Sequence, residues 1–94
     1  MPPKPEAAPA WVYVLRCADG SLYTGWTVDL VRRLARHGAG TASRYTASRR
    51  PVTLVLALPM PDRSSARREE ARIKRLDRIA KLALIDAAPP ADTK

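Results

Sequence analysis

The sequence predicts a small domain of the α/β (α+β) class, in which a three-stranded, mostly antiparallel sheet is covered by helices. Residues 11–15 and 21–27 are short, largely apolar runs separated by a stretch that contains Asp-Gly, a pattern typical of a β-hairpin. Residues 52–58 form a third run that is apolar nearly throughout, which indicates a strand that is central in the sheet or covered on both faces. Amphipathic stretches lie between and after these runs, so the expected order is β-β-α-β-α-α.

Helices are expected in three places around this sheet. The first covers residues 28–37, where Thr27 can serve as the N-cap and apolar residues recur at helical spacing. The second covers about residues 63–76 after a turn rich in proline and aspartate, and a short last helix follows Asp77. The polar and basic stretch 41–50 is expected to be a loop.

The length of 94 residues is that of one domain. Residues 11–85 are expected to fold, and the proline-containing flanks, residues 1–10 and 86–94, are expected to be disordered tails. The single cysteine, Cys17, cannot form a disulfide within the chain and is expected to be a small buried residue. No apolar run is long enough to span a bilayer and the N-terminus lacks the apolar region of a signal peptide, so we expect a cytoplasmic protein without a membrane partner.

The charge balance is the strongest compositional signal. Lysine and arginine number 17 against 9 acidic residues, a formal net charge of +8. Solubility alone could explain such a charge, but arginines that occur in groups favour a polyanionic partner, of which nucleic acid is the commonest. The basic groups are Arg32, Arg33 and Arg36; Arg44, Arg49 and Arg50; and Arg67, Arg68, Arg72, Lys74, Arg75 and Arg78.

The residues needed to hydrolyse a phosphodiester bond are present. A strand tyrosine can relay or accept a proton if a metal ion or an arginine lowers its pKa. An arginine can stabilise the charge that develops on the phosphoryl oxygens, and one carboxylate can hold Mg²⁺ beside phosphate oxygens and water. No P-loop and no usual set of zinc ligands offers a competing interpretation.

Two short motifs resemble those of the GIY-YIG nuclease superfamily. Tyr13 matches the tyrosine that ends the first motif, although Trp11 and Val12 replace its glycine and isoleucine. Tyr23 and Gly25 match the tyrosine and glycine of the second motif. The resemblance covers nearly the whole of the expected folded unit and is nearest to the small stand-alone bacterial YhbQ-like branch.

The resemblance implies a set of catalytic residues. The catalytic arginine of the family falls on Arg33, and His37 matches a position that carries histidine or tyrosine in different branches. Tyr13, Tyr23, Arg33 and His37 are therefore the expected catalytic residues. Taken singly, each has a simpler explanation, such as cross-strand packing for the tyrosines or a favourable helix-dipole interaction for His37.

Two adjacent glutamates are candidates for the metal-binding glutamate of the family. The YhbQ-like branch carries lysine four residues after this glutamate, and Glu70 with Lys74 fits that spacing. Glu69 would share a helix face with Ile73 and Leu76, so helical periodicity alone does not exclude it. We expect Glu70 to bind Mg²⁺ or Mn²⁺; its simpler explanation is an ion pair with Lys74.

The resemblance implies a divalent-metal-dependent endonuclease that hydrolyses phosphodiester bonds in nucleic acid, with DNA the expected substrate, in repair or recombination. The expected nucleic-acid contacts are Gly25, Arg36, Arg44, Arg49, Arg50 and Lys74. Trp26 stands where some members of the family carry a lysine. A protein partner could supply targeting. The alternatives are a non-catalytic nucleic-acid-binding module and an adaptor in a DNA-processing complex.

Overall fold

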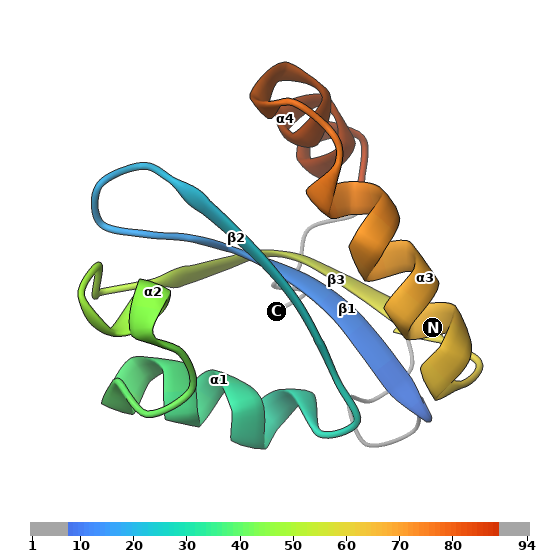
Figure 1. Cartoon of the computed structure of the whole chain (residues 1–94), viewed down its shortest axis with the longest axis horizontal. Coiled ribbons are helices and arrows are strands. Elements are labelled where there is room, and N and C mark those ends of the chain that lie inside the picture. The colour runs from blue at the N-terminus through green and yellow to red at the C-terminus, as the bar shows by residue number, and fades with distance from the viewer. Residues whose placement is uncertain (1–7, 89–94) are drawn as a thin grey trace.

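The computed structural model describes residues 8–88, and it confirms the predicted order of the main elements (Figure 1). The strands are β1 (Ala10–Arg16), β2 (Leu22–Thr27) and β3 (Thr53–Met60). The helices are α1 (Leu30–Ala39), α2 (Arg44–Ala47), α3 (Arg63–Lys74) and α4 (Arg78–Ala87). The single turn α2 was not predicted and lies in the stretch expected to be a loop.

The ends of the folded unit differ slightly from the prediction. Strand β1 begins at Ala10, which is buried, and α4 continues to Ala87, so both extend beyond the expected range of 11–85. Residues 1–7 and 89–94, where most of the expected tails fall, lie outside the described residues. Within residues 8–88, no helix has the length and apolar character needed to cross a bilayer.

Strand β1 is the middle strand of a fully antiparallel sheet with the order β2-β1-β3. Strand β3 is therefore an edge strand, and its apolar residues pack on both faces: Leu56 and Leu58 on one, Leu54 and Ala57 on the other. The sequence predicted that this strand is either covered on both faces or central in the sheet. Coverage on both faces is confirmed, and the central position is wrong. The hairpin pairs one side of β1 with β2, which leaves the other side for β3.

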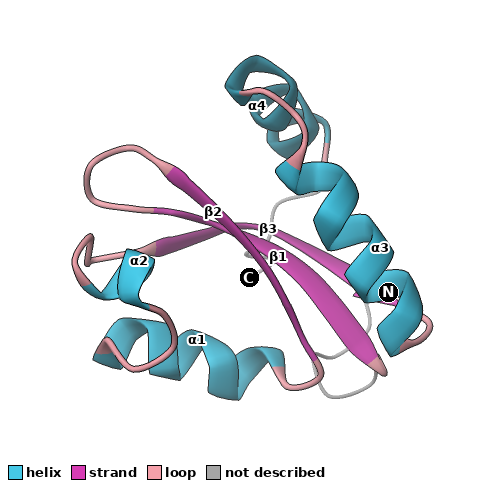
Figure 2. Ribbon diagram, in the orientation of Figure 1, coloured by secondary structure: helices cyan, strands magenta, loops and turns pink. Residues whose placement is uncertain are grey.

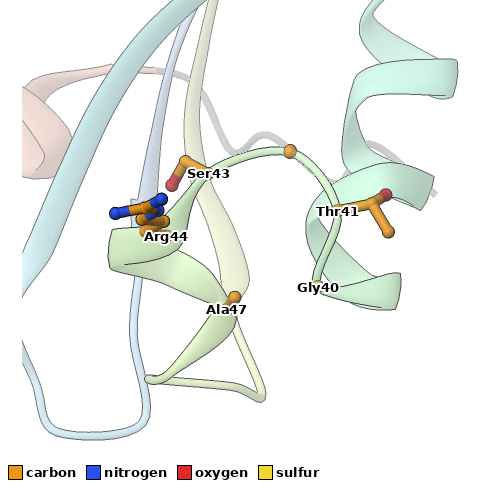
Figure 3. Close-up of a pocket in the computed structure, with 6 residues that line it drawn as sticks. Gly40, Thr41, Ser43, Arg44 and Ala47 are labelled. Carbon is orange, nitrogen blue, oxygen red and sulfur yellow. The ribbon is translucent and has the colours of Figure 1, made fainter.

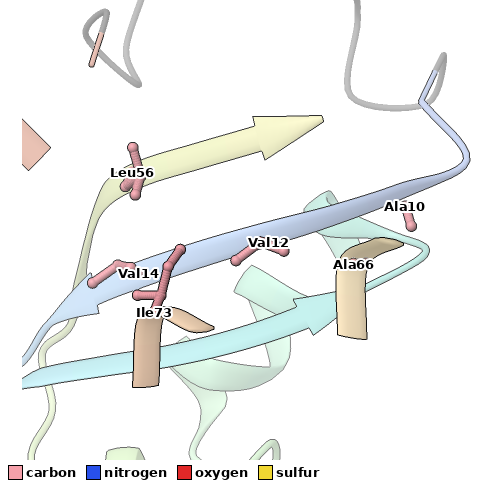
Figure 4. Close-up of a cluster of buried hydrophobic side chains, with 6 residues drawn as sticks. All are labelled: Ala10, Val12, Val14, Leu56, Ala66 and Ile73. Carbon is pink, nitrogen blue, oxygen red and sulfur yellow. The ribbon is translucent and has the colours of Figure 1, made fainter. Parts of the chain in front are cut away.

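Helices cover both faces of the sheet, with α1 and α2 on one side and α3 and α4 on the other (Figure 2). Alternate residues of β1 point to opposite faces, as the pleat of a strand requires. Val12 and Val14 pack with Ala66 and Ile73 of α3, as Figure 4 shows. On the opposite face, Trp11, Tyr13 and Leu15 form a cluster with Leu30 of α1. We call these the α3 face and the α1 face.

Aspartate caps start the three longer helices. Asp29, Asp62 and Asp77 each accept a hydrogen bond from a backbone N–H three residues further on, at the starts of α1, α3 and α4. The predicted cap of the first helix, Thr27, is wrong by two residues, because its hydroxyl instead accepts a hydrogen bond from the backbone N–H of Asp29 at 3.1 Å. Helix α1 ends at Gly40, whose φ of 81° suits glycine. These ends fix α1 directly after β2.

Candidate active site

Tyr13 lies at the centre of the candidate site, on the middle strand. Its side chain is buried and lies across its register partner Gly25 on β2. A Cβ atom added to Gly25 would lie 2.6 Å from the Tyr13 hydroxyl oxygen, a distance that side chains do not tolerate. The glycine of the second motif thus makes room for the tyrosine of the first. Contact between Gly25 and nucleic acid stays a prediction.

The Tyr13 hydroxyl begins a line of buried hydrogen bonds. The Tyr13 hydroxyl oxygen lies 2.8 Å from Nε2 of His37, and Nδ1 of His37 lies 2.8 Å from Oγ1 of Thr46. His37 and Thr46 have no exposed surface. Three residues from β1, α1 and α2 therefore meet at one point, although they are far apart in the sequence.

Tyr23 completes an aromatic group around His37. Its ring centroid lies 6.5 Å from that of Tyr13 and 5.3 Å from the imidazole of His37, which it meets at its edge. The two motif tyrosines therefore lie close together on neighbouring strands of the predicted hairpin. On its other side, the ring of Tyr23 stacks with Tyr45 of α2 at 6.0 Å.

Burial sets the protonation states in this group. It raises the pKa of Tyr13 to about 12, an effect that a hydrogen bond with Arg33 opposes and that the charge of Glu70 increases. Burial, followed by the charges of Arg33 and Arg36, holds the pKa of His37 below its ordinary value of 6.5. Tyr13 and His37 are therefore both neutral near pH 7.

The two glutamates of α3 differ in their surroundings. Both carboxylate oxygens of Glu69 bind the guanidinium of Arg72, at 3.0 and 2.7 Å. Among the described residues, Glu70 has a single ion pair, at 3.2 Å, with Lys74. Of the two glutamates, only Glu70 contributes to the pKa of Tyr13. The charge of Glu70 thus reaches the candidate site, whereas the carboxylate of Glu69 is held by Arg72.

A metal ion at this site would have few protein ligands. Within residues 8–88 there is no group of three or more histidine, cysteine, aspartate or glutamate side chains that could hold a metal ion. Glu70 offers one carboxylate, which forms an ion pair with Lys74. Such a site fits Mg²⁺ or Mn²⁺, because a hard cation is often held by one carboxylate together with water and substrate phosphate oxygens.

Several of the predicted nucleic-acid contacts also hold the fold together. Arg36 donates to the carbonyl oxygen of Thr41 at 3.0 Å. The guanidinium of Arg50 donates to the carbonyl oxygens of Ala47 and Gly38, near the ends of α2 and α1. These hydrogen bonds give Arg36 and Arg50 a structural role. The presence of arginine at these two positions is therefore not, by itself, evidence that they contact nucleic acid.

Arg49 fastens the hairpin turn to α2. Its Nε atom lies 3.1 Å from a carboxylate oxygen of Asp19, and its guanidinium lies 3.8 Å from the ring centroid of Tyr45. The stack of Tyr45 on Tyr23 then continues this contact to the candidate site. Arg44 is exposed and has no side-chain partner within residues 8–88, so it is the predicted contact most available to a ligand.

A surface pocket lies beside α2 (Figure 3). Its lining consists of Gly40, Thr41, Ala42, Ser43, Arg44 and Ala47. None of the expected catalytic residues lines this pocket. The candidate active site is instead the cluster around the Tyr13 hydroxyl.

The sequence interpretation missed Thr46 and Tyr45 as parts of this cluster. A local signal existed, because Ser43 caps α2 by accepting a hydrogen bond from the backbone N–H of Thr46 at 3.1 Å. A serine in a basic stretch could therefore have indicated a helical turn. The contact with His37 depends on how α2 folds back over α1, and no local pattern contains that information.

Comparisons with known proteins identify the class to which this fold and cluster belong. A family model described as the GIY-YIG catalytic domain matches residues 9–82. The chain therefore belongs to the GIY-YIG family, as its two motifs predicted. This family points to the nuclease superfamily, whose members act on nucleic acid and generally use divalent metal ions.

Individual relatives narrow this assignment to proteins named UPF0213. One from Xanthomonas axonopodis pv. citri (strain 306) is 46% identical over 85 residues, covering 89% of this chain and 83% of that protein. One from Streptococcus sanguinis (strain SK36) is 49% identical over 76 residues, covering 81% and 87%. The solution NMR structure of a UPF0213 protein from Bacillus halodurans, 40% identical, matches with a TM-score of 0.56 and covers 82% of both chains. This match confirms the predicted fold class.

Proposed function

We propose that the protein is a divalent-metal-dependent endonuclease that hydrolyses phosphodiester bonds in nucleic acid, with DNA the expected substrate. Family membership supports the nuclease class. The observation that carries the proposal is the buried 2.8 Å hydrogen bond between Tyr13 and His37. It joins two neutral groups with opposite pKa shifts beside an arginine, an arrangement suited to proton transfer.

The pair can take a proton from the attacking water without forming a free phenolate. As the Tyr13 oxygen accepts the proton of the water, its own proton passes to Nε2 of His37. This step requires His37 to be neutral, which its lowered pKa provides at pH 7. A proton relay of this kind also explains how a tyrosine with a raised pKa can take part in base catalysis.

Arg33 and Glu70 supply the charges. The Arg33 guanidinium, whose influence lowers the pKa of Tyr13, stabilises the negative charge that grows on the phosphoryl oxygens. Glu70 would hold Mg²⁺ or Mn²⁺, which when bound stabilises charge on the phosphate and on the leaving oxygen. Tyr23 positions the imidazole of His37 through its ring contact.

The net charge of +8 supplies general attraction to the phosphate backbone. A role in DNA repair or recombination, a cytoplasmic location and a protein partner that supplies targeting belong to the same proposal. The alternative is a non-catalytic nucleic-acid-binding module or an adaptor. Such a protein would use the same basic surface to bind but would not cleave nucleic acid.

A cleavage assay separates these functions. Single-stranded, duplex, flapped and branched DNA and RNA are incubated with the protein in Mg²⁺, Mn²⁺ or EDTA. We expect cleavage of at least one substrate that EDTA abolishes. Binding to a labelled oligonucleotide, titrated with salt in parallel, is expected to weaken steeply as salt rises. Salt-sensitive binding without cleavage of any substrate would favour the binding module instead.

A further inference from the structure

The hydrogen bonds at His37 continue beyond the pair used in the proposed reaction. Oγ1 of Thr46 lies 2.8 Å from Nδ1 of His37 and 3.0 Å from Oγ of Ser43. The same oxygen lies 3.4 Å from the carbonyl oxygen of Ser43. Thr46 is fully buried, and a buried threonine hydroxyl beside an imidazole nitrogen restricts which nitrogen carries the proton.

The distances from the two ring nitrogens to Tyr13 and Thr46 are compatible with either tautomer of His37. The donors and acceptors around the ring favour one of them. The neighbouring Arg33 has no acceptor atom, so Nε2 of His37, 2.8 Å away, is the acceptor that the described residues offer to the Tyr13 proton. A neutral imidazole has one N–H, which must then be on Nδ1 and directed at Thr46. Thr46 can accept it because its own proton has acceptors on Ser43.

We propose that Thr46 is a positioning residue that holds His37 in the Nδ1–H tautomer, so that Nε2 is ready to receive the Tyr13 proton. This inference rests on the proposed function. It gives the unpredicted turn α2 a purpose, since α2 supplies the third member of a Tyr13–His37–Thr46 line. Ser43 acts one step further out, by fixing the direction of the Thr46 hydroxyl.

The proton balance of the step shows why Thr46 matters. An O–H bond of water breaks and its proton goes to the Tyr13 oxygen, while the Tyr13 proton goes to Nε2, so that His37 becomes an imidazolium. Both ring nitrogens then donate: Nε2–H to Tyr13 and Nδ1–H to Thr46. After the product leaves, the Nε2 proton returns through Tyr13 to solvent. Without the Thr46 hydroxyl, the Nδ1–H of a buried cation would lose the acceptor that the described residues offer it.

Other groups also act on His37 and must stay constant in any test. Tyr13 and Tyr23 face it from the sheet, and Arg33 and Arg36 act on it from α1, where their charges oppose its protonation. Glu70 acts on Tyr13 rather than on His37. Replacing Thr46 leaves all of these groups in place.

The test uses nuclear magnetic resonance, because His37 is the single histidine of the chain. The ¹⁵N shifts of the imidazole report its tautomer and its pKa, and they do not depend on whether the protein cleaves anything. The variants are Thr46→Val, which keeps the shape and removes the hydroxyl, and Thr46→Ser, which keeps the hydroxyl. Thr41→Val is the matched control, because the Thr41 hydroxyl donates to the carbonyl oxygen of Arg36 and not to His37.

We expect the Nδ1–H tautomer in the wild type and in Thr41→Val. In Thr46→Val, we expect a smaller Nδ1–H population and a lower pKa of His37, and Thr46→Ser should restore both. Where cleavage is measured, Thr46→Val should lower kcat by about 10- to 100-fold with little change in KM, the size expected for losing a hydrogen bond to a charged group.

Two results would overturn the inference. One is an Nε2–H tautomer in the wild type, a result that needs no variant to fold. The other is a Thr46→Val spectrum and titration identical to those of the wild type. A wild type that shows the expected tautomer but cleaves nothing would count against the proposed nuclease and not against the position of the proton.

Discussion

On the α3 face of the sheet, β1 contributes Val12 and Val14 to a cluster of aliphatic side chains. On the α1 face, the same strand contributes Tyr13, whose hydroxyl meets the buried polar groups of His37 and Thr46. Alternate residues of one strand thus serve two different purposes. The α3 face stabilises by excluding water, and the α1 face encloses a hydrogen-bonded group with perturbed pKa values.

The difference shows where this small domain can carry chemistry. Burying a polar side chain destabilises a fold unless the group is hydrogen-bonded. On the α1 face, each of Tyr13, His37 and Thr46 has a partner at 2.8 Å. Burial therefore shifts the proton equilibria of Tyr13 and His37 without leaving any of the three unpaired. Substitutions on this face should therefore alter activity first, and substitutions on the α3 face should alter stability first.

Substitution of Glu70 is expected to have the largest effect on activity. It sharpens the comparison because the same helix, α3, carries both this proposed metal ligand and, three residues later, the core residue Ile73. Glu70→Gln should reduce metal-dependent cleavage to background, since the neutral amide loses the charge that holds a hard cation. Cleavage and metal binding by calorimetry measure this. Glu69→Gln is the matched control and should do far less, because its carboxylate is occupied by Arg72. The reverse pattern would identify Glu69 as the ligand.

Arg33 gives the next largest effect. Arg33→Ala should lower turnover by about 10²–10³-fold, the range found when one donor to a developing oxyanion is removed. Nucleic-acid affinity should change modestly, because many other basic residues remain. Turnover and affinity are measured separately on the same substrate. A loss confined to affinity would make Arg33 a residue that only positions the backbone.

Ile73 tests the α3 face. Its side chain is fully buried, so Ile73→Ala should lower the free energy of unfolding by about 2–5 kcal/mol. Urea denaturation measures this, and cleavage per folded molecule should stay near the wild-type value. A variant that keeps its stability but loses activity would contradict the division of labour between the two faces.

His37 gives the smallest effect, a dependence of stability on pH. Its pKa in the folded protein is below 6.5, so the unfolded chain takes up a proton first as the pH falls. The free energy of unfolding should therefore decrease as the pH falls below about 6.5 towards the lowered pKa. Urea denaturation at pH 7.5 and 5.5 measures the change, and His37→Gln should flatten it. Greater stability at pH 5.5 would show that folded His37 is protonated.

Three carboxylates with lowered pKa values should not obscure this measurement. The pKa values of Asp19, Asp62 and Glu69 are lowered by hydrogen bonds, from Ser21, Ser65 and Arg72 respectively. They therefore titrate below the pH range of the experiment.

Local patterns in the sequence predicted the strands and the longer helices, because alternation, Asp-Gly and helical spacing act over a few residues. They also predicted the hairpin, and its strand pairing brings Tyr13 and Tyr23 together. The preference for Glu70 over Glu69 came from the lysine spacing of the family. The surroundings of the two carboxylates favour the same choice.

Contacts between distant segments were beyond such reasoning. The Thr46–His37 hydrogen bond arises because α2 folds over the end of α1, and nothing near either residue encodes it. The basic groups gave the sign of the surface charge but not the partners of single arginines. Arg50, for example, has the appearance of a phosphate ligand in the sequence and donates to two helix-end carbonyls in the structure.

The close approach of the Tyr13 ring to Gly25 has an evolutionary consequence. A Cβ atom at position 25 would clash with the Tyr13 side chain. The effect of a substitution at one position therefore depends on the residue at the other, so the two positions are epistatic. Gly25→Ala should be harmful beside Tyr13 and nearly harmless beside Tyr13→Ala, so a double-mutant cycle should be strongly non-additive. The two family motifs are separate in the sequence, but Tyr13 and Gly25 are expected to evolve together.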